Sequence, residues 1–255
     1  MSDEAEPLAL VVGGGSGIGA ALVAAHRAQA TRTVVWDITG ERDMTCDVAD
    51  PDAVGEAVAR TRSDWGIPDR VTVTAGVGHG GLLTNVPVDE FDRVMAVNAR
   101  GPWLCLRAWA RVMEAESRAG SFVAVSSISA RLADRSMGVY CMSKAALSMF
   151  VKVAAREWGP LGLRVNAVAP GATLTPMLGP FGSSSARSPW LTAVAGRTAL
   201  GRLGEAEDVA QVILGLHDMA WVTGQVLECD GGLALHSPID AYGEMTRRTG
   251  GAPSP

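Results

Sequence analysis

The sequence predicts an α/β protein in which residues 1–255 form one domain on a doubly wound parallel sheet, with about seven strands and helices on both faces. Short apolar runs of strand length alternate with stretches of helical periodicity, beginning with the run Leu8–Val12. A glycine-rich turn joins this first run to a helix, and polar or turn-forming residues follow most of the other runs. Parallel strands need crossover connections, so this alternation favours a parallel sheet.

The first part of the chain begins the alternation. Leu8–Val12 is uniformly apolar, as expected of a strand that is buried on both faces. Asp50 is a candidate helix N-cap because Pro51 follows at the first helical position. The predicted elements are a strand at Leu8–Val12, a helix from the glycine turn to about Ala30, strands at Thr33–Asp37 and Met44–Val48, a helix at Pro51–Trp65, and a strand from Arg70 into a turn at Gly76.

Predicted strands and helices continue to alternate in the second part of the chain. We predict helical structure at Pro87–Glu116 with an interruption near Gly101-Pro102, a strand at Ser121–Ser127, a helix at Tyr140–Trp158, a strand at Leu163–Val168, an irregular segment at Met177–Thr198, a helix at Glu205–Met219 and a strand at Gln225–Cys229. The polar tail at 236–255 is expected to be loose at its end. In such a sheet a ligand binds at the carboxyl ends of the strands.

Composition argues against several classes of function. The net charge is −5 and no basic run occurs, which disfavours nucleic acid or an anionic membrane as a partner. The four cysteines are scattered without metal-ligand spacing, so we expect reduced thiols, a cytoplasmic location and no metal. Leu8–Ala25 is uncharged and long enough for a membrane span, but its five glycines favour a strand, a loop and a helix start.

The turn Gly13–Gly19 has the composition of a phosphate-binding loop. Glycines let the backbone approach a pyrophosphate, and the N-terminus of the following helix offers N–H groups. Two spacings fit: Gly15, Gly17 and Ala20 match Gly-x-Gly-x-x-Gly/Ala, and Gly13, Gly17 and Gly19 match Gly-x-x-x-Gly-x-Gly. A tight turn without a ligand is the alternative.

Asp37 ends the second predicted strand, about 20 residues after the glycine loop. A carboxylate at this place can accept hydrogen bonds from both hydroxyls of an adenosine ribose. The alternative is a residue that only caps a turn at the end of the strand.

Tyr140 and Lys144 are four residues apart in a predicted helix, so one turn places them on the same face. An ammonium favours the phenolate, and we therefore predict that Tyr140 can titrate below its usual pKa of about 10. Such a tyrosine can exchange a proton with a carbonyl or an alcohol near neutral pH. The chain has only two tyrosines and two lysines, which argues against an ordinary surface pair. His79 could reach this site, although a solvent-facing position is expected for it.

These residues resemble the short-chain dehydrogenase/reductase family, and the resemblance extends from about Leu8 to Leu235. Each motif is weak alone, but their order and spacing are specific. The matching motifs are Gly13-x-x-x-Gly17-x-Gly19, Asp47-Val48, Ala75-Gly76, Asn98, Ser127, Tyr140-x-x-x-Lys144, Asn166-Ala-Val-Ala-Pro-Gly171, Thr175-Pro-Met177, Glu207-Asp-Val-Ala210 and Thr223-Gly…Asp230-Gly-Gly232.

The resemblance implies a Rossmann-like sheet and a role for each matching residue. Tyr140 is general acid in carbonyl reduction and general base in alcohol oxidation, and Lys144 lowers its pKa and holds the nicotinamide ribose. Ser127 binds the substrate oxygen, and Asn98 holds a water in the proton relay. The implied cofactor contacts are Gly13, Ser16, Gly17, Ile18, Gly19, Asp37, Asp47, Val48, Ala75, Gly76, Tyr140, Lys144, Pro170, Gly171, Thr173 and Thr175.

The chain departs from the family pattern near the cofactor residues. Val12 stands where threonine is usual before the first glycine, so one hydrogen bond that steadies the loop is expected to be missing. Val73-Thr74 replaces the usual Asn-Asn before Ala75-Gly76. Only about ten residues separate Asp37 from Asp47, too few for the usual intervening helix. Ala206 replaces a common proline, and Leu216–Gly224 is shorter than usual.

The expected cofactor is NAD(H). Asp37 repels a 2′-phosphate, and NADP-preferring relatives are expected to carry a basic residue at the places that Ser16 and Ile38 occupy. Arg42 is the one nearby cation, and a swing toward the ribose would weaken this preference.

The expected reaction is hydride transfer between the nicotinamide and a secondary alcohol or ketone. The substrate loop, residues 176–200, contains Leu178, Phe181 and Trp190, which suggest an apolar or cyclic substrate or, equally, packing of a lid. A catalytically silent dinucleotide-binding sensor or scaffold is the alternative, and a dehydratase or epimerase is a weaker one.

The resemblance also implies a homotetramer, or else a dimer. Trp103, Leu106, Trp109 and Met113 follow a helical stripe that could serve both the core and an interface, or face only the sheet.

Overall fold

A computed structural model of the chain describes residues 6–181 and 188–235. Seven parallel strands form one sheet in the order β3-β2-β1-β4-β5-β6-β9, so the chain reverses direction across the sheet between β1 and β4. This confirms the predicted doubly wound, Rossmann-like sheet. The strands are β1 Leu8–Val12, β2 Arg32–Asp37, β3 Met44–Thr45, β4 Arg70–Val73, β5 Gly120–Val125, β6 Leu163–Pro170 and β9 Val226–Cys229.

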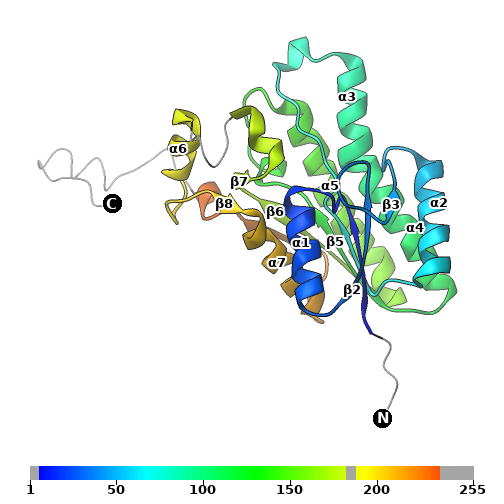
Figure 1. The fold of residues 1–255 in the computed structure, drawn as a ribbon. Coiled ribbons are helices and arrows are strands. Elements are labelled where there is room, and N and C mark those ends of the chain that lie inside the picture. Colours follow the sequence, from blue (N-terminus) through cyan, green and yellow to red (C-terminus); the bar gives the residue numbers. More distant parts are fainter. Residues whose placement is uncertain (1–5, 182–187, 236–255) are drawn as a thin grey trace, which may run out of the picture.

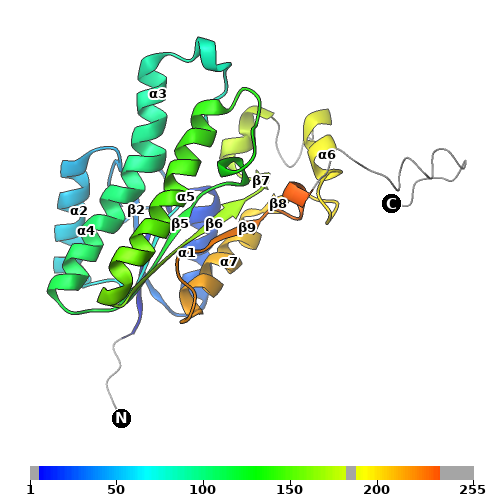
Figure 2. The ribbon, with the colours of Figure 1, turned by 180° about the vertical axis from the view of Figure 1, so that it is seen from behind.

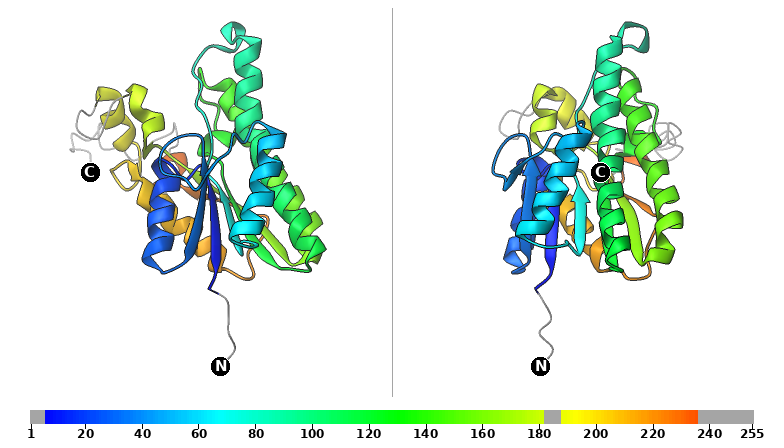
Figure 3. Two further views of the ribbon diagram at one scale, coloured as in Figure 1. Left: turned by 45° about the vertical axis from the view of Figure 1, so that its right-hand side comes forward. Right: turned by 90° about the vertical axis from the view of Figure 1, so that its right-hand side faces the viewer.

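Helices cover both faces of this sheet, as Figures 1 and 3 show. The side chains of β1 alternate between the two faces: Leu10 and Val12 belong to the core under α2, α4 and α5, whereas Val11 packs with α1 and α7. The long helices are α1 Gly17–Ala28, α2 Pro51–Asp64, α3 Val88–Met95, α4 Gly101–Ala115, α5 Gly138–Trp158 and α7 Ala206–Asp218.

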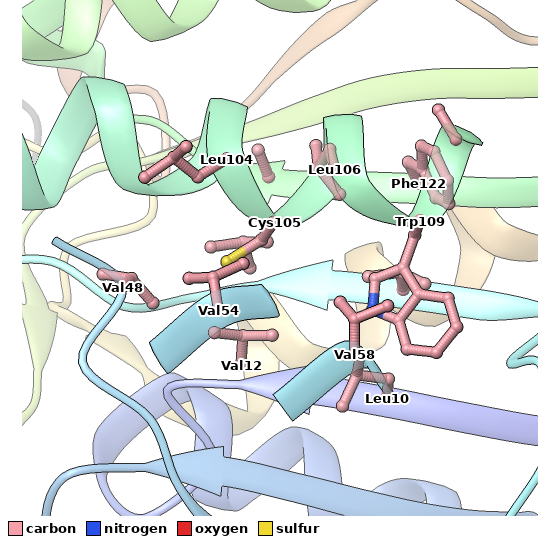
Figure 4. Close-up of a cluster of buried hydrophobic side chains, with 14 of the residues drawn as sticks. Leu10, Val12, Val48, Val54, Val58, Leu104, Cys105, Leu106, Trp109 and Phe122 are labelled. Atoms are coloured by element: carbon pink, nitrogen blue, oxygen red, sulfur yellow. The ribbon is translucent and has the colours of Figure 1, made fainter. Parts of the chain in front are cut away.

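The larger core lies between the sheet and helices α2, α4 and α5 (Figure 4). Trp109 of α4 is fully buried, and its ring centroid lies 6.3 Å from that of Trp36 on β2. The indole nitrogen of Trp36 donates a 2.9 Å hydrogen bond to the Thr61 hydroxyl of α2, which satisfies the one polar atom of that side chain. These contacts fix α2 and α4 on the same face of the sheet.

The α4 stripe faces this core. Leu106, Trp109 and Met113 are fully buried, and Trp103 alone of the four is exposed, at 40%. The suggestion that the stripe serves two surfaces is therefore wrong for three of its members, because α4 packs between the sheet and its neighbouring helices.

Several element boundaries differ from prediction. The third strand covers only Met44–Thr45, because Asp47 starts a turn: its carboxylate accepts the Ala49 N–H and its carbonyl accepts the Asp50 N–H. As predicted, Asp50 caps α2 by accepting from the N–H groups of Asp52 and Ala53. The helical interruption lies just before Gly101, where Ala96–Arg100 forms a π-helical segment between α3 and α4.

The segment predicted as irregular contains two helical pieces, a 3₁₀ helix η5 at Pro176–Phe181 and helix α6 at Pro189–Ala195. The Ser188 hydroxyl caps α6 by accepting from the Leu191 N–H, and Pro189 follows at the first helical position. A small second sheet pairs β7, Thr173–Leu174, with β8, Gly204–Glu205. Residues 182–187 and the tail 236–255 lie outside the described residues, as does the side chain of Phe181.

The uncharged stretch Leu8–Ala25 forms β1, the glycine loop and most of α1, as predicted. One described helix, Gly138–Leu161, is long and apolar enough to cross a membrane by length and composition alone, with a mean hydropathy of 1.2. A buried core helix passes the same test, and 44% of the apolar window is buried inside this fold.

Candidate active site

The glycine loop connects β1 to α1 at the carboxyl edge of the sheet (Figures 1 and 2). A methyl group added to Gly19 would lie 2.0 Å from the Gly13 carbonyl oxygen, and one added to Gly13 would lie 2.4 Å from the Ala75 nitrogen. Gly13 and Gly17 also have positive φ angles of 88° and 52°. The loop therefore requires glycine at these positions for close backbone packing.

The start of α1 provides the donors that a pyrophosphate needs. The first N–H groups of a helix lack partners within the helix, and the Ser16 hydroxyl, at the N-cap, makes no capping hydrogen bond. A helix N-terminus beside a compact glycine loop has the space and polarity for an anionic phosphate group. The residues present thus fit a dinucleotide, with Gly13, Ser16, Gly17, Ile18 and Gly19 around its phosphates.

Thr74, which follows β4, holds this loop from the side. Its backbone N–H donates to the Val12 carbonyl at 2.8 Å, and its hydroxyl lies 3.1 Å from the same oxygen and 2.9 Å from the Gly13 carbonyl. Val12 has no hydroxyl to make the hydrogen bond of the usual threonine, and Thr74, just after the neighbouring strand, supplies another one. Only the structure reveals this, because Thr74 is distant from Gly13 in sequence.

Asp37 lies next to the glycine loop at the end of β2. One carboxylate oxygen accepts the Gly15 N–H at 2.8 Å, and the other accepts the N–H groups of Ile38 and Thr39 at 2.7 and 2.9 Å. Asp37 thus makes the turn contacts of the alternative interpretation. The Thr39 hydroxyl also donates to the Asp37 carboxylate at 3.3 Å, so ribose hydroxyls would have to share or replace some of these hydrogen bonds.

Arg42 is held beside this turn. Its guanidinium donates to the Gly40 carbonyl at 2.8 Å and to the Thr45 hydroxyl at 3.0 Å. These two hydrogen bonds oppose a movement of the Arg42 side chain toward the expected position of the adenosine ribose. No helix occupies the described segment between β2 and β3, as the short spacing predicts.

Asp47 and Val48 lie further along the same edge. Asp47 is exposed, whereas Val48 is buried and sits so close to the start of α4 that a methyl group on Gly101 would lie 2.8 Å from it. Among the described residues, no hydrogen bond joins either one to the glycine loop, so their predicted role in cofactor binding stays a prediction.

Ser127, just after β5, meets Tyr140 and Lys144 of the first two turns of α5. The phenol of Tyr140 is buried and hydrogen-bonds Ser127, whose hydroxyl also accepts the Ser129 N–H at 3.1 Å. The Lys144 ammonium lies 5.8 Å from the centre of the Tyr140 ring and donates to the Val125 carbonyl at 2.8 Å. The predicted serine, tyrosine and lysine are therefore brought together.

The protonation of this cluster differs from prediction. Burial raises the pKa of Tyr140 above 10, and the Ser127 hydrogen bond only partly opposes this. Burial likewise lowers the pKa of Lys144 to about 8, because its ammonium is fully enclosed. The predicted fall in the tyrosine pKa is wrong for this state, since Lys144 donates to Val125 rather than to the phenol and desolvation dominates.

Asn98 closes the cluster from the π-helical segment. Its amide oxygen accepts the Val77 N–H at 2.8 Å, and its amide nitrogen donates to the Val77 carbonyl at 2.9 Å and to the Ser143 hydroxyl at 3.1 Å. Ser143 in turn donates to the Tyr140 carbonyl at 2.7 Å. Asn98 therefore ties the loop after β4 to α5, a contact that the implied water-holding role did not include.

Gly76 joins the catalytic and glycine-loop halves of the site. A methyl group there would lie 3.4 Å from both the Asn98 amide oxygen and the Lys144 nitrogen. Ala75, its neighbour, donates to the Val12 carbonyl at 3.2 Å. The two halves are thus connected through the turn after β4.

The segment after β6 lies across the glycine loop. The side chain of Thr175 lies 3.4 Å from the position of a methyl group on Gly17, while its hydroxyl donates to the Thr173 carbonyl. Thr173 donates to the Gly171 carbonyl at 3.1 Å, and Gly171 donates to Cys229 on β9. Pro170 ends β6, so this whole segment is anchored to the edge of the sheet.

Other polar contacts in the site were not predicted. The Ser126 hydroxyl lies 2.7 Å from that of Ser148 and donates to the Lys144 carbonyl at 3.2 Å. Ser143 and Ser148 are helix residues without a motif of their own, and only their spacing from Lys144 could have indicated them. In the described parts of the chain, no three acidic, histidine or cysteine side chains gather in a metal-binding group.

Comparison with known proteins agrees with this geometry. The family model described as enoyl-(acyl carrier protein) reductase matches residues 14–234. The chain is 33% identical to a (3R)-3-hydroxyacyl-CoA dehydrogenase of Canis lupus familiaris, over 89% of this chain and 96% of the relative. It is 32% identical to a 2,5-dichloro-2,5-cyclohexadiene-1,4-diol dehydrogenase of Sphingobium indicum, over 91% and 98% of the two chains.

Solved structures show the same fold. Ligand-free aldohexose dehydrogenase of Thermoplasma acidophilum superimposes with a TM-score of 0.85 at 25% identity, covering 92% of this chain and 97% of that one. ElxO with NADP bound gives a TM-score of 0.83 at 26% identity and covers 91% and 100%. The chain therefore belongs to the short-chain dehydrogenase/reductase family, whose members are oxidoreductases that bind a nicotinamide dinucleotide.

Proposed function

We propose that the protein interconverts a secondary alcohol and a ketone with NAD(H), using Tyr140 as the general acid or base. The observation that carries this proposal is the buried cluster of Ser127, Tyr140 and Lys144 beside Gly76, which adjoins the glycine loop. A silent sensor or scaffold of the same fold does not require these three groups to meet.

The bound nicotinamide supplies or accepts the hydride. Ser127 binds the substrate oxygen and holds it against the Tyr140 hydroxyl, which gives the proton in reduction and takes it in oxidation. Lys144 holds the nicotinamide ribose in this proposal, and its ammonium, 5.8 Å from the centre of the Tyr140 ring, is the nearby cation that would stabilise a phenolate. Asn98 fixes the turn after β4 and, as the family pattern implies, holds a water of the proton relay.

Two relatives support a secondary alcohol as the substrate class, because a 3-hydroxyacyl group and a cyclohexadiene diol both carry one. Exposed apolar side chains in the predicted substrate segment, Met177 and Trp190, support an apolar or cyclic molecule. The described parts of the predicted substrate segment, 176–181 and 188–200, contribute to the pocket in this proposal.

The cofactor preference rests on Asp37. Its carboxylate lies against the glycine loop, where the adenosine ribose belongs, and Arg42 is occupied by Gly40 and Thr45. A 2′-phosphate would meet a like charge there. The structure of ElxO holds NADP and that of a 4-hydroxyisoleucine dehydrogenase mutant holds NADH, so the fold alone does not fix the cofactor.

We further propose a cytoplasmic homotetramer or dimer that associates through α4 and α5. Trp103, Met142, Met149 and Val153 are large apolar side chains that remain exposed on these two helices. The family association implied by the sequence uses these same helices.

The direct test is reduction of acetoacetyl-CoA, cyclohexanone and 2-decalone with NADH, beside oxidation of the matching alcohols with NAD. NADH binding should be measured in parallel by its fluorescence. Turnover of at least one ketone is expected. Tight NADH binding without turnover in either direction, over a broad carbonyl panel, would favour the sensor instead.

A further inference from the structure

The loop that follows β4 is rich in glycine and lacks regular structure. Residues Val77–Leu82 include Gly78, Gly80 and Gly81, and they form no strand or helix. Glycine has the most backbone freedom to lose on folding, so such a loop holds one shape only if other contacts fix it.

The neighbours of this loop belong to the substrate side of the site. A methyl group on Gly78 would lie 3.8 Å from Met177, which begins the predicted substrate segment. Gly81 donates to the Ser136 carbonyl at 2.7 Å, just before α5. Leu83 packs against Gly138, two residues before Tyr140, so closely that a methyl group there would lie 2.4 Å from it. The loop therefore runs between η5 and the N-terminus of the catalytic helix.

His79 supplies the side-chain anchor in the middle of the loop. Its Nδ1 lies 3.3 Å from a carboxylate oxygen of Glu90 on α3, and only 16% of its side chain is exposed. The expected solvent-facing position is therefore wrong. Arg93 holds the same carboxylate through two nitrogens at 2.9–3.2 Å, so the acceptor is fixed in place.

The Nδ1 atom of His79 faces the Glu90 carboxylate. A carboxylate only accepts, so Nδ1 carries the hydrogen that faces Glu90. Nε2 is enclosed without a partner among the described residues, and a methyl group on Gly81 would lie 3.3 Å from it. An unpaired buried acceptor is unfavourable, so the Glu90 contact and the packing together must hold the ring here.

We propose that His79 is a positioning residue for the substrate: it pins the glycine loop to α3 and thereby fixes one wall of the substrate pocket. This rests on the oxidoreductase function proposed above. His79 touches no reacting atom in this proposal. It acts by holding Gly78 toward Met177 and Leu83 toward the start of α5.

The test compares His79→Ala with His79→Asn, whose amide can still donate to Glu90. Asp89→Asn is the matched control, because Asp89 is an exposed acid on the same turn of α3. Hydrogen exchange of residues 77–82 and NADH affinity are measured without substrate. KM and kcat are measured with whichever of acetoacetyl-CoA, cyclohexanone and 2-decalone the unmodified protein reduces.

His79→Ala should speed exchange in the loop and raise KM about tenfold, with kcat and NADH affinity little changed. His79→Asn should have an exchange rate and a KM close to those of the unmodified protein, and Asp89→Asn should leave both unchanged. If hydrogen exchange of the loop is unchanged in His79→Ala, His79 does not anchor the loop. If exchange is faster but KM is unchanged, the loop does not form a wall of the substrate pocket. Absence of turnover in every protein, the unmodified one included, would overturn the underlying oxidoreductase function instead.

Discussion

Thr74 shows how one hydroxyl stabilises a loop that the cofactor must use. It lies between the carbonyls of Val12 and Gly13, and a methyl group on either Gly13 or Gly19 would lie 2.7 Å from it. The N–H groups of the loop keep their orientation only if these carbonyls are held. The residue is therefore expected to influence cofactor affinity without touching the substrate.

Thr74→Val keeps the shape of the side chain and removes the hydrogen bond. We expect NADH to bind about fivefold more weakly, equivalent to about 1 kcal/mol, together with a lower unfolding midpoint. Thr74→Ser should bind NADH almost as the unmodified protein does. Fluorescence titration with NADH measures both, and equal affinity in the valine variant would contradict the role of the hydroxyl.

We propose that a second single residue, Asp37, determines the choice of dinucleotide. We expect kcat/KM to favour NAD(H) over NADP(H) at least tenfold, about 1.4 kcal/mol. Asp37→Ala should shrink that ratio mainly by improving use of NADP(H), because the repulsion of the 2′-phosphate disappears. Equal or better use of NADPH by the unmodified protein would show that Asp37 does not face the ribose.

At the scale of elements, a buried histidine pair joins α1 to α7. The rings of His26 and His217 lie 6.3 Å apart, and His217 contacts the hydroxyls of Thr72 and Ser121. Burial, reinforced by the charge of Arg70 and opposed by that of Asp218, lowers the pKa of His26 to about 4. The pKa of His217 is lowered well below its usual value by burial, by His26 and by Arg70 and Arg164.

Both groups link folding to pH. His26 stays neutral in the folded protein until about pH 4, whereas in the unfolded chain it takes up a proton near pH 6.5. Protons therefore favour the unfolded state, and stability falls as pH falls from about 6.5 to about 4. Between pH 7 and 5 we expect His26 alone to account for a loss of about 2 kcal/mol.

Urea unfolding at pH 7 and pH 5 measures this loss. His26→Leu should unfold with a smaller difference between the two pH values, because the titrating group is gone. His217 continues to titrate, so some dependence remains. An identical difference in both proteins would contradict the assignment to His26.

Strands and helices were predictable where the spacing of apolar residues and the length of the segment indicate the same type of element. β1, α2, α5 and α7 match their predicted ranges within two residues, because apolar runs, a cap at Asp50 and a stop at Gly159-Pro160 define them locally. α6 was missed although Ser188-Pro189 is a recognisable start, since the helix is short. Gly101-Pro102 indicated a break in the helix, but the sequence did not indicate that the break is a π-helical segment that contains Asn98.

The candidate site could be predicted from the sequence about as far as the fold could. Motif residues at strand ends, such as Ser127 and Asp37, follow from the topology of the sheet. The pairing of His79 with Glu90, the hydroxyl of Thr74 under the glycine loop and the raised pKa of Tyr140 depend on tertiary packing and desolvation. No pattern within one segment encodes these.

At the scale of the whole molecule, exposed apolar side chains remain on α4 and α5. Met149 and Val153 of α5 are 58% and 46% exposed, and Trp103 adds a large apolar surface from α4. Large apolar side chains exposed together on one part of a surface commonly mark an interface. We therefore expect association of the chain through this surface.

Light scattering at micromolar concentration should show a tetramer or a dimer. Met149→Asp places a charge in the proposed interface and should shift the protein toward smaller species, while Met177→Asp, on the substrate side, should not. A monomer in the unmodified protein would contradict the proposed association.

The central claim is that Tyr140 transfers the proton to and from the substrate oxygen. Tyr140→Phe removes the hydroxyl and keeps the ring that packs beside Lys144, so the fold and NADH affinity should be nearly unchanged. The decisive measurement is kcat for the best ketone substrate in this variant, with NADH binding measured on the same sample. Loss of turnover by about 10²-fold or more is expected of a general acid. Retention of more than about a tenth of the original rate would contradict that role.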